Sequence, residues 1–350
     1  MKYEIFHSID DIEKEEWSAL SGDTIPDQQY EWFRVVEKTV PRYIARYVVV
    51  REGPEVKGIA GLNLESEFSL GILDRYPMIK NVLQSVFSSP VLEATAPHSS
   101  FSSIFLTQDR NAEEMLFAGI SDITKKETCM GILLSNFYEK KPFTRYGYSE
   151  FMLSPNTCLD IQWDSFDTYL DSWSPKRRHS LKSSLRKGEK KGYHIVFPSS
   201  LGPYAEQMSQ LKTNVANHNN NPSTILPPSF FRECESYCGD LAEAALCFKD
   251  DSLVAFTFSL HTQEVCTVKF VGLDYKYSDA YYYLYVDALR RGIEHGFKRM
   301  YFGRGTYTFK ERLGCHRIGI INYIRMKNTF LNPIMSSVFR LWKVHEDERV

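Results

Sequence analysis

The spacing of apolar and polar positions predicts an alternation of helices and strands over most of the chain. Apolar residues recur at helical intervals in residues 9–20 and 30–38, which indicates two amphipathic helices. Two short apolar runs, YIARYVVV (43–50) and VKGIAGLNL (56–64), then flank a Glu-Gly-Pro turn at residues 52–54. Strands joined by such a turn predict a β-hairpin.

The second half of the chain repeats this outline. A second hairpin is expected at residues 243–260, so that one hairpin falls in each half. A chain built from two copies of one fold would show this recurrence. Around the hairpins the pattern predicts helices at 111–125, 165–173, 174–191, 204–217, 228–237 and 280–296, strands at 102–107, 131–137, 264–272, 299–303 and 318–327, a helical turn at 308–314 and a polar loop at 218–228.

These elements predict a protein of the α/β (α+β) class with two lobes in tandem. Each lobe is expected to be a mixed, mostly antiparallel sheet flanked by helices. We assign residues 1–155 to an N-terminal lobe, 156–335 to a C-terminal lobe and 336–350 to a tail. A length of 350 residues with 43% hydrophobic content is enough for two such cores.

Composition narrows the class of protein. The formal net charge of -2 argues against a surface that coats nucleic acid everywhere, although a local basic stripe can still bind phosphate. The seven cysteines are odd in number and scattered, which favours reduced thiols and a cytoplasmic setting. Cys234 and Cys238 lack a second pair at ligand spacing, so we expect no metal site. The N-terminus is unlike a signal peptide, and no apolar stretch approaches the ~20 residues of a membrane span.

The most unusual charge pattern is SWSPKRRHSLKSSLRKGEKKG (172–192), a basic run with a single acid, Glu189. The Ser-Pro pair at 174–175 is typical of a helix start. Cations in the first turn then lie at the unfavourable end of the helix dipole, and cations one turn apart repel each other. A polyanionic partner explains the run better than an ordinary solvated helix. Its expected contacts are Arg177, Arg178, Lys182 and Arg186.

The order of elements in residues 252–327 is hairpin, central strand, long helix, strand, helical turn and strand, and it resembles the acyltransferase domain of the GNAT superfamily. The likeness is closest to the Fem-like branch, whose members join two GNAT-type halves and make amide bonds from aminoacyl-tRNA or acyl-CoA. It is carried by residues 164–192, 269–305 and TFKERLG (308–314). The resemblance implies two GNAT-like lobes, no tightly bound cofactor, and a donor that is aminoacyl-tRNA, slightly favoured, or acyl-CoA. The acceptor would be a small-molecule or peptide amine.

One departure from that family concerns the donor. A typical acetyl-CoA domain has a glycine-rich loop between the central strand and the long helix, where backbone N–H groups hold the pyrophosphate. Here the junction is LDYKYSDAYYYLY (273–285), which contains no glycine. Without the glycine-rich loop, the usual mode of CoA binding is less expected in this half of the chain. CoA is still retained as one of the two candidate donors.

Two groups of residues near this junction are candidates for substrate contact. Asp274 and its neighbours are expected at the carboxyl end of the central strand, where open sheets place ligands. The tyrosines at 281–285 cannot all face one core, because a helix turns about 100° per residue. Lys310 follows a Gly-Arg-Gly turn, and in the resembling family a lysine at this position belongs to the substrate-binding region, although a solvated turn is the ordinary alternative. We expect catalytic roles for Asp274 and Lys310, and substrate binding by Tyr277, Tyr281, Arg304 and Tyr307.

The predicted reaction is transfer of an activated acyl or aminoacyl group to an amine, with formation of an amide. Such a transfer needs no protein nucleophile, because an amine attacks directly once both groups are held in line. Candidates for a general base are Asp274, His218 and His179. An acceptor pocket is expected between the lobes. The alternative from another class is a non-catalytic RNA- or phosphate-binding protein that retains the fold.

Overall fold

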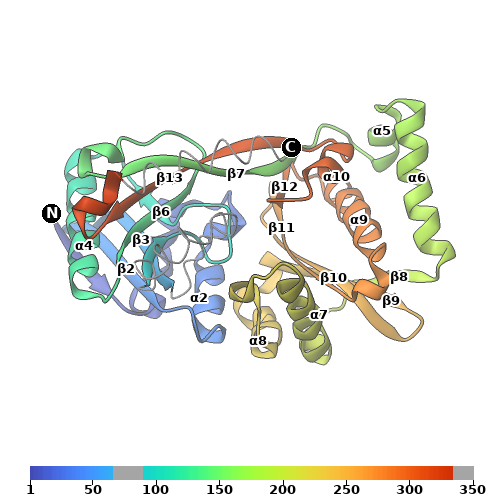
Figure 1. Ribbon diagram of the computed structural model, residues 1–350, viewed down its shortest axis with the longest axis horizontal. Helices are drawn as coiled ribbons and strands as arrows, with labels where there is room; N and C mark the ends of the chain where they lie inside the picture. Colours follow the sequence, from blue (N-terminus) through green and yellow to red (C-terminus); the bar gives the residue numbers. More distant parts are fainter. Residues whose placement is uncertain (66–89, 334–350) are drawn as a thin grey trace.

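The computed structural model describes residues 1–65 and 90–333. Its two lobes lie side by side along the longest axis, and strands β7 (Ser149–Asp160) and β13 (His316–Met326) run between them (Figure 1). The α/β class and the two-lobed arrangement are therefore confirmed. The predicted tail at residues 336–350 lies outside the described residues.

The first half follows the predicted elements closely. Helix α4 (Arg110–Lys126) shows why: the side chain of Asp109 accepts hydrogen bonds from the N–H groups of Asn111 and Ala112 at its start, at 2.8 and 3.3 Å, and the helix ends in Lys125 and Lys126. The other elements are β1 (Lys2–Phe6), α1 (Lys14–Ser21), α2 (Tyr30–Thr39), β2 (Ala45–Glu52), β3 (Glu55–Glu65), β4 (Val91–Ala94), β5 (Ile104–Leu106) and β6 (Gly131–Phe137). The predicted helix at 9–20 is in fact a 3-10 turn, Ile9–Asp11, followed by α1, and strands β1, β4 and β7 were not predicted.

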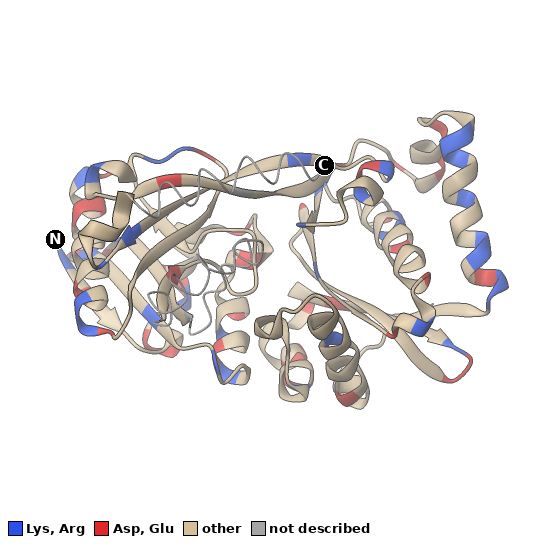
Figure 2. Ribbon diagram, in the orientation of Figure 1, with Lys and Arg blue, Asp and Glu red and all other residues tan. Residues whose placement is uncertain are grey.

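The second half begins with two helices that have no counterpart in the first half. These are α5 (Phe166–Asp171) and α6 (Pro175–Lys190), which contains the basic run. Lysine and arginine residues follow α6 along the outer edge of the second lobe (Figure 2). The remaining elements are β8 (Tyr193–Val196), α7 (Ala205–His218), α8 (Pro228–Cys238), β9 (Ala242–Lys249), β10 (Ser252–His261), β11 (Val265–Leu273), α9 (Ala280–Glu294), β12 (Arg299–Gly303) and α10 (Tyr307–Arg312).

A single sheet runs through both lobes, and its strand order is equivalent from either end. In the described part of the chain the order is β1-β2-β3-β4-β6-β13-β7-β12-β11-β10-β9-β8. When the strands are counted inward from the two edges of the sheet, they correspond as follows: β1 to β8, β2 to β9, β3 to β10, β4 to β11 and β6 to β12. The internal repeat that the two hairpins indicated therefore extends over these strands, whereas β5 pairs with β3 off this path and has no equivalent in the described part of the second half.

The two lobes exchange their last strands at the centre of this sheet. Strand β13 comes from the end of the second half but pairs antiparallel with β6 of the first half. Strand β7 comes from the first half but pairs antiparallel with β12 of the second, and β7 and β13 also pair with each other. Each lobe is thus completed by a strand from the other half. The predicted lobe boundary at residues 155 and 156 falls inside β7.

Each lobe also contains one parallel strand pair, and each pair opens at its carboxyl end. β4 pairs with β6 over Val91–Ala94, with α4 as the crossover helix. β11 pairs with β12 only over Val265–Thr267, with α9 as the crossover, while β11 continues beside β10 as far as Leu273. Ligands in open α/β sheets bind where neighbouring strands diverge in this way.

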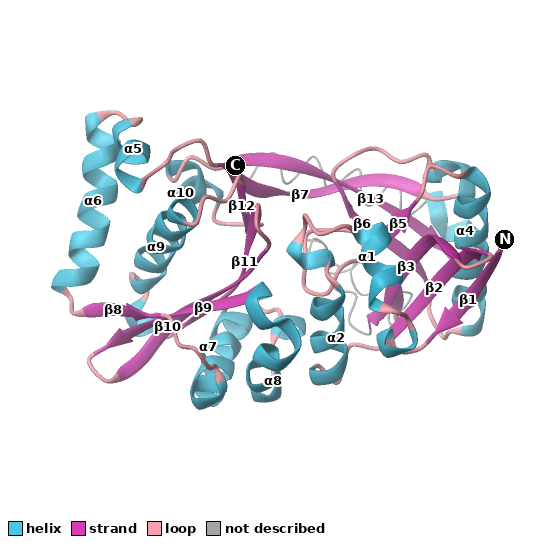
Figure 3. Cartoon of the chain, turned by 180° about the vertical axis from the view of Figure 1, so that it is seen from behind, coloured by secondary structure: helices cyan, strands magenta, loops and turns pink. Residues whose placement is uncertain are grey.

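Aromatic packing holds the lobes against each other below the sheet. Helices α7 and α8 cover one face of the second lobe's strands and α9 covers the other (Figure 3). Trp32 on α2 of the first half packs edge-on against Phe230 on α8 at 5.8 Å and lies 6.2 Å from Phe270 on β11. These three rings are at most 6% exposed, so burial of apolar area stabilises this contact between the halves.

Candidate functional site

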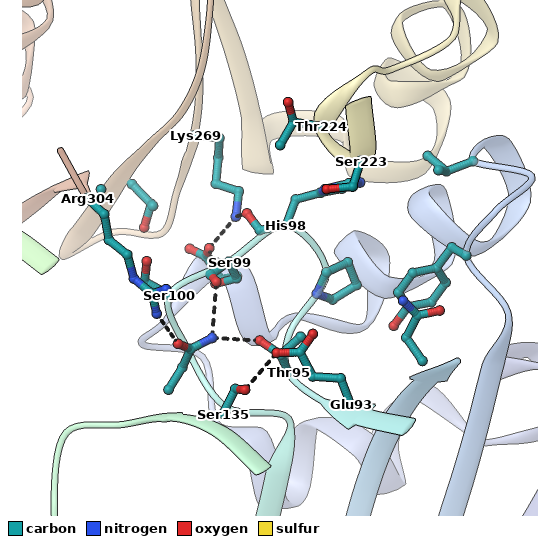
Figure 4. A pocket seen from close by; sticks show the side chains of 18 of the residues that line it. Glu93, Thr95, His98, Ser99, Ser100, Ser135, Ser223, Thr224, Lys269 and Arg304 are labelled. Atoms are coloured by element: carbon teal, nitrogen blue, oxygen red, sulfur yellow. Dashed lines mark hydrogen bonds and ion pairs between the residues drawn. The ribbon is translucent and has the colours of Figure 1, made fainter. Parts of the chain in front are cut away.

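A cavity of about 450 Å³ lies between the lobes, at the point where both parallel strand pairs open (Figure 4). Glu93 on β4 and Ser135 on β6 line it from the first half, and Thr267 on β11 and Gly303 on β12 line it from the second. Two loops complete the wall, residues 97–100 and residues 221–224. The position agrees with the expected acceptor pocket between the lobes.

A buried ion pair crosses the cavity wall from one lobe to the other. Nζ of Lys269 on β11 lies 2.5 Å from Oδ1 of Asp27, and the two side chains are 1% and 0% exposed. The same Nζ donates to the carbonyl of His98 at 2.7 Å, and Ser99 Oγ donates to Asp27 Oδ1 at 2.6 Å. Burial lowers the pKa of Lys269, and the Asp27 carboxylate opposes that shift. The pair fixes the 98–99 loop of the first half against the central strand of the second.

His98 has both an unusual backbone and an uncharged ring. Its φ of 47° places it in the left-handed region, which is uncommon for a residue with a side chain. Burial, together with the nearby cations Lys269, Arg42 and Lys212, lowers the pKa of His98 to about 3. The imidazole is therefore neutral at physiological pH, and its buried Nε2 is a hydrogen-bonding group with no partner in the described chain.

Four buried polar atoms of the cavity lining have no hydrogen-bond partner among residues 1–65 and 90–333. They are Asp27 Oδ2, Tyr43 Oη, His98 Nε2 and Thr267 Oγ1. The five other atoms of this kind in the same residues are distributed over the rest of the molecule. Leaving a buried polar group unpaired costs about 1–3 kcal/mol, so native proteins normally satisfy it. Their concentration at one cavity indicates a site that binds a polar ligand.

Asn136 connects Arg304 to the loop of the first half. It also has a left-handed backbone, with φ of 71°, and its N–H donates to Asn322 Oδ1 at 3.0 Å. Its side-chain Nδ2 donates to Thr95 Oγ1 at 2.7 Å and to the Ser99 carbonyl at 3.2 Å, while its Oδ1 accepts from the guanidinium of Arg304. Arg304 was predicted to bind substrate, and it is the predicted residue that lines the cavity.

Glu93 and Arg42 are charged groups on the remaining wall. Ser135 Oγ donates to Glu93 Oε1 at 2.6 Å, which joins the ends of β4 and β6. The guanidinium of Arg42 donates to carbonyls of the 222–225 loop, including Pro222 at 2.8 Å and Ile225 at 2.7 Å. A loop of the second half is thereby held on the first lobe.

Lys310, predicted to be catalytic, supports the cavity wall from behind. It is 1% exposed, and its Nζ donates to the carbonyls of Gly303 and Arg304 at 3.1 and 3.2 Å. Burial lowers its pKa to about 8. Gly303 and Gly305 have φ values of 75° and 77°, a conformation that favours glycine. The structure therefore gives Lys310 a positioning contact with the turn that presents Arg304.

The other residues predicted near the long helix lie outside the cavity lining. Asp274 accepts a hydrogen bond from the N–H of Lys276 at 3.0 Å and so caps a short 3-10 turn. Tyr281 shares a hydrogen bond of 3.0 Å with Thr306 Oγ1 and packs 4.4 Å from Tyr285. Tyr285 is 6% exposed, which agrees with core packing for part of the tyrosine run.

Three further predicted residues make ordinary structural contacts. Tyr277 packs edge-on at 6.5 Å from Tyr193, and Tyr307 donates to the carbonyl of Pro155 at 2.9 Å. His218 stacks on Tyr275 at 4.1 Å, and His179 is exposed on α6. The two histidines do not line the cavity, so their geometry does not support a role as its general base.

The first turn of α6 differs from expectation. Arg177 donates to the carbonyls of Glu311 and Arg312, and its guanidinium lies 3.3 Å from the centre of the Trp173 ring. Those carbonyls end α10, where a cation is favourable, because the end of that helix carries partial negative charge. Arg178 pairs with Asp171 at 3.0 Å. Arg178 therefore has an acid beside it that the charge pattern of residues 172–192 did not reveal, whereas the partners of Arg177 are neutral carbonyl groups and an aromatic ring.

The remaining cations of α6 form what we call the basic face, which consists of Lys176, Lys182, Arg186, Lys187 and Lys190. In the chain as described, none of them has an ion pair. They lie on the side of the helix opposite Leu181 and Gly188, which are buried. Gly188 allows α6 to approach α9 closely, because a Cβ there would lie 2.5 Å from a ring carbon of Tyr283.

A trio of potential metal ligands occurs elsewhere, where β7 meets β13. Ligand atoms of Cys158, Asp160 and His316 lie within 4.8 Å of one another, with Cys158 Sγ 3.2 Å from His316 Nε2. Burial raises the pKa of the Cys158 thiol to about 12, and Arg299 already pairs with Asp160 at 2.5 Å. A protonated thiol and a paired carboxylate are poor metal ligands.

Sequence reasoning missed Asp27, His98 and Lys269. Lys269 had a local signal, because it interrupts the apolar strand VCTVKFVGL. Asp27 had none, since its partner lies 242 residues away. For His98 the decisive feature is a left-handed backbone, which the sequence does not display.

Comparison with known proteins identifies the fold. Residues 175–311, from α6 to α10, match the family model of the acetyltransferase (GNAT) domain. No curated protein matches the sequence. Among the described residues, no helix combines the length and the apolar character that crossing a membrane requires.

Solved structures match nearly the whole chain at low sequence identity. FemX is 14% identical, with a TM-score of 0.59 over 95% of this chain and 100% of its own. The C-terminal domain of a putative lysylphosphatidylglycerol synthetase from Agrobacterium fabrum is 13% identical, with a TM-score of 0.56 over 93% and 95%. A tandem GNAT protein from the clavulanic acid biosynthesis pathway, solved without acetyl-CoA, is 14% identical, with a TM-score of 0.54 over 93% and 98%. The predicted likeness to the Fem-like GNAT branch is thus confirmed at the level of fold.

Proposed function

We propose that this protein is an N-acyltransferase that forms an amide between an activated acyl or aminoacyl group and an amine bound in the cavity between the lobes. The observation that supports this most strongly is the position of the cavity. It lies where the parallel strands of the region that matches the GNAT model diverge, at Thr267 on one strand and Gly303 on the other. Its lining includes polar atoms that have no partner in the described part of the chain. A small polar substrate can be fixed there with its nitrogen close to a donor.

The chemistry requires positioning and two proton transfers. An ammonium acceptor first loses a proton to solvent, and its nitrogen then attacks the carbonyl carbon of the donor. The tetrahedral intermediate collapses with cleavage of the C–O or C–S bond, and the nitrogen gives up a second proton, with which the tRNA hydroxyl or CoA thiol leaves. We assign the binding of the amine to Asp27 Oδ2 and His98 Nε2, since both are buried atoms without a partner in the described chain, and a neutral His98 with its proton on Nδ1 accepts at Nε2.

Aminoacyl-tRNA is the favoured donor, with acyl-CoA second. The basic face lies along the outer edge of the second lobe, away from the cavity, so a donor that engages both must carry phosphates over an extended surface (Figure 2). A tRNA does so, and neutralisation of its phosphates by lysine and arginine would supply binding energy. The junction before α9 contains a capped 3-10 turn and no glycine to bring the backbone close to a diphosphate. Acyl-CoA is kept as the second option because residues 175–311 match the model of the acetyltransferase (GNAT) domain.

The proposal is tested by supplying donors in separate reactions. The purified protein is incubated with a mixture of amines and either acetyl-CoA or a labelled aminoacyl-tRNA pool, and stable amides are detected by mass spectrometry. We expect product with one donor class. No product with either class, together with tRNA retention on the protein, would favour the non-catalytic RNA-binding alternative.

A Lys310→Met variant separates these functions further. Lys310 holds the carbonyls of Gly303 and Arg304, so its loss should displace the cavity wall. An enzyme should lose most of its turnover in this variant while binding tRNA as before. A protein that only binds RNA through α6 should be unaffected.

A further inference from the structure

We propose that the acceptor bound in the cavity is a small amine carrying several hydroxyl groups, of the chemical type of an amino sugar. This inference rests on the proposed N-acyl transfer and names the class of acceptor. It is drawn from three properties of the lining, namely the kinds of side chain present, the hydrogen bonds they leave open and the balance of charge.

Neutral hydrogen-bonding side chains dominate the lining. Val40, Pro97 and Val268 are its apolar side chains. Pockets for drug-like molecules are mainly apolar with a few polar groups, whereas hydroxyl and amide side chains surround this cavity, so it fits a ligand with several polar groups. A volume of about 450 Å³ suits a small molecule. The hydroxyl and amide residues are Tyr43, Asn63, Thr95, Ser99, Ser100, Ser135, Asn136, Asn156, Asn221, Ser223, Thr224 and Thr267.

The unpartnered atoms specify the groups that the ligand must present. Asp27 Oδ1 already accepts from Lys269 and Ser99, and Oδ2 has no partner among residues 1–65 and 90–333. Because the side chain is 0% exposed, this oxygen requires an N–H or O–H donor. The hydroxyl groups of Tyr43 and Thr267, on residues 9% and 7% exposed, can each donate and accept. An ammonium beside Asp27 and hydroxyl groups beside Tyr43 and Thr267 would satisfy all three.

The cationic groups of the lining, Lys269, Arg42 and Arg304, are already engaged by the protein. Lys269 is paired with Asp27, Arg42 holds the 222–225 loop, and Arg304 is bound to Asn136. A phosphate or other strongly anionic group is normally bound by cations directed toward it. These contacts therefore favour a ligand recognised chiefly through neutral hydroxyl groups and a single amine.

Isothermal titration with four probes tests the acceptor class without any donor present. We expect glucosamine to bind most tightly. Glucose should bind several-fold more weakly, because it lacks the ammonium for Asp27, and serine and hexylamine should bind more weakly still. Equal or tighter binding of serine or hexylamine, or no binding of glucosamine, would overturn the proposal.

Two variants and a matched control locate the binding. Thr267→Val and Tyr43→Phe each remove a hydroxyl without a partner in the described chain, so the free protein should keep its thermal stability or gain some, while glucosamine binds about three- to tenfold more weakly. Tyr148→Phe removes a buried, unpartnered hydroxyl outside the cavity and should leave binding unchanged. Equal effects of all three substitutions on binding would contradict the assignment.

The two proposals fail in different ways. Transfer to some other amine by a protein that does not bind glucosamine would contradict the acceptor class and leave N-acyl transfer standing. Glucosamine binding that is sensitive to Thr267→Val, without turnover with either donor, would support the ligand chemistry of the cavity and contradict the proposed function.

Discussion

The central cavity and helix α6 both concentrate charge, but they place it in opposite environments. In the cavity, Lys269 is 1% exposed and depends on a single carboxylate, Asp27. On α6, the basic face is solvent-accessible, and each cation there contributes little to stability. The run of positive charge on α6 therefore contributes less to the stability of the fold than the buried Asp27–Lys269 pair does. The isolated lysine in an apolar strand matters more, because a buried charge must be paired.

The largest loss in the free energy of unfolding should appear when one partner of the buried Asp27–Lys269 pair is removed. Asp27→Ala leaves Lys269 charged in the interior and should lower the free energy of unfolding by about 3–5 kcal/mol. Lys182→Ala on the basic face should change it by less than about 0.5 kcal/mol. Urea denaturation of both variants gives the comparison, and similar losses in the two would contradict it.

A smaller difference in the free energy of unfolding should separate the alanine variants of Arg177 and Lys182, two cations of helix α6. Arg177 caps the end of α10 and stacks on Trp173, so Arg177→Ala should cost about 1–2 kcal/mol in the free energy of unfolding. Thermal or urea denaturation beside Lys182→Ala tests this. An Arg177→Ala variant as stable as Lys182→Ala would show that the contacts with α10 contribute nothing.

Acid should destabilise the cavity before it affects α6. The pKa of His98 is lowered from 6.5 to about 3 in the folded protein, so below pH 6.5 the unfolded chain binds a proton that the folded chain does not. Stability contributed by neutral His98 is complete above pH 6.5 and is lost progressively as the pH falls toward 3. From pH 7 to 5.5 the loss should be about 1 kcal/mol by urea denaturation. His98→Asn, which tolerates the left-handed backbone, should lack this part of the loss, and an unchanged profile would contradict the assignment.

The smallest effect on stability should accompany a clear effect on RNA binding. Replacing Lys182 and Arg186 by alanine should leave the free energy of unfolding within about 0.5 kcal/mol and should reduce the slope of log Kd for tRNA against log salt by about 2. Filter binding between low and moderate salt measures the slope. Arg178→Ala is a matched control, because Arg178 is already paired with Asp171, and an equal change in slope there would contradict the assignment of the basic face.

Much of the local structure could be predicted from the sequence, because helices and strands follow from nearest neighbours. Two features that were predicted correctly in this way are the start of α6 at Ser174-Pro175 and the strands of the two hairpins. The exchange of β7 and β13 could not be predicted, since either strand could equally have completed its own lobe. Arg304 was found because its flanking glycines are a local signal. The contact of Asp27 with Lys269 depends on the exchange and packing of the lobes, and so only the structure reveals it.

The claim that acyl transfer takes place in the cavity is tested most directly by the Michaelis constant for the amine acceptor, measured at saturating donor in Thr267→Val. The expected result is a three- to tenfold rise in that constant, with the Michaelis constant for the donor unchanged and with Tyr148→Phe behaving like the unmodified protein. A Thr267→Val protein with an unchanged acceptor constant, beside a Lys182→Ala, Arg186→Ala protein in which that constant rises, would place the acceptor on α6 and contradict the claim.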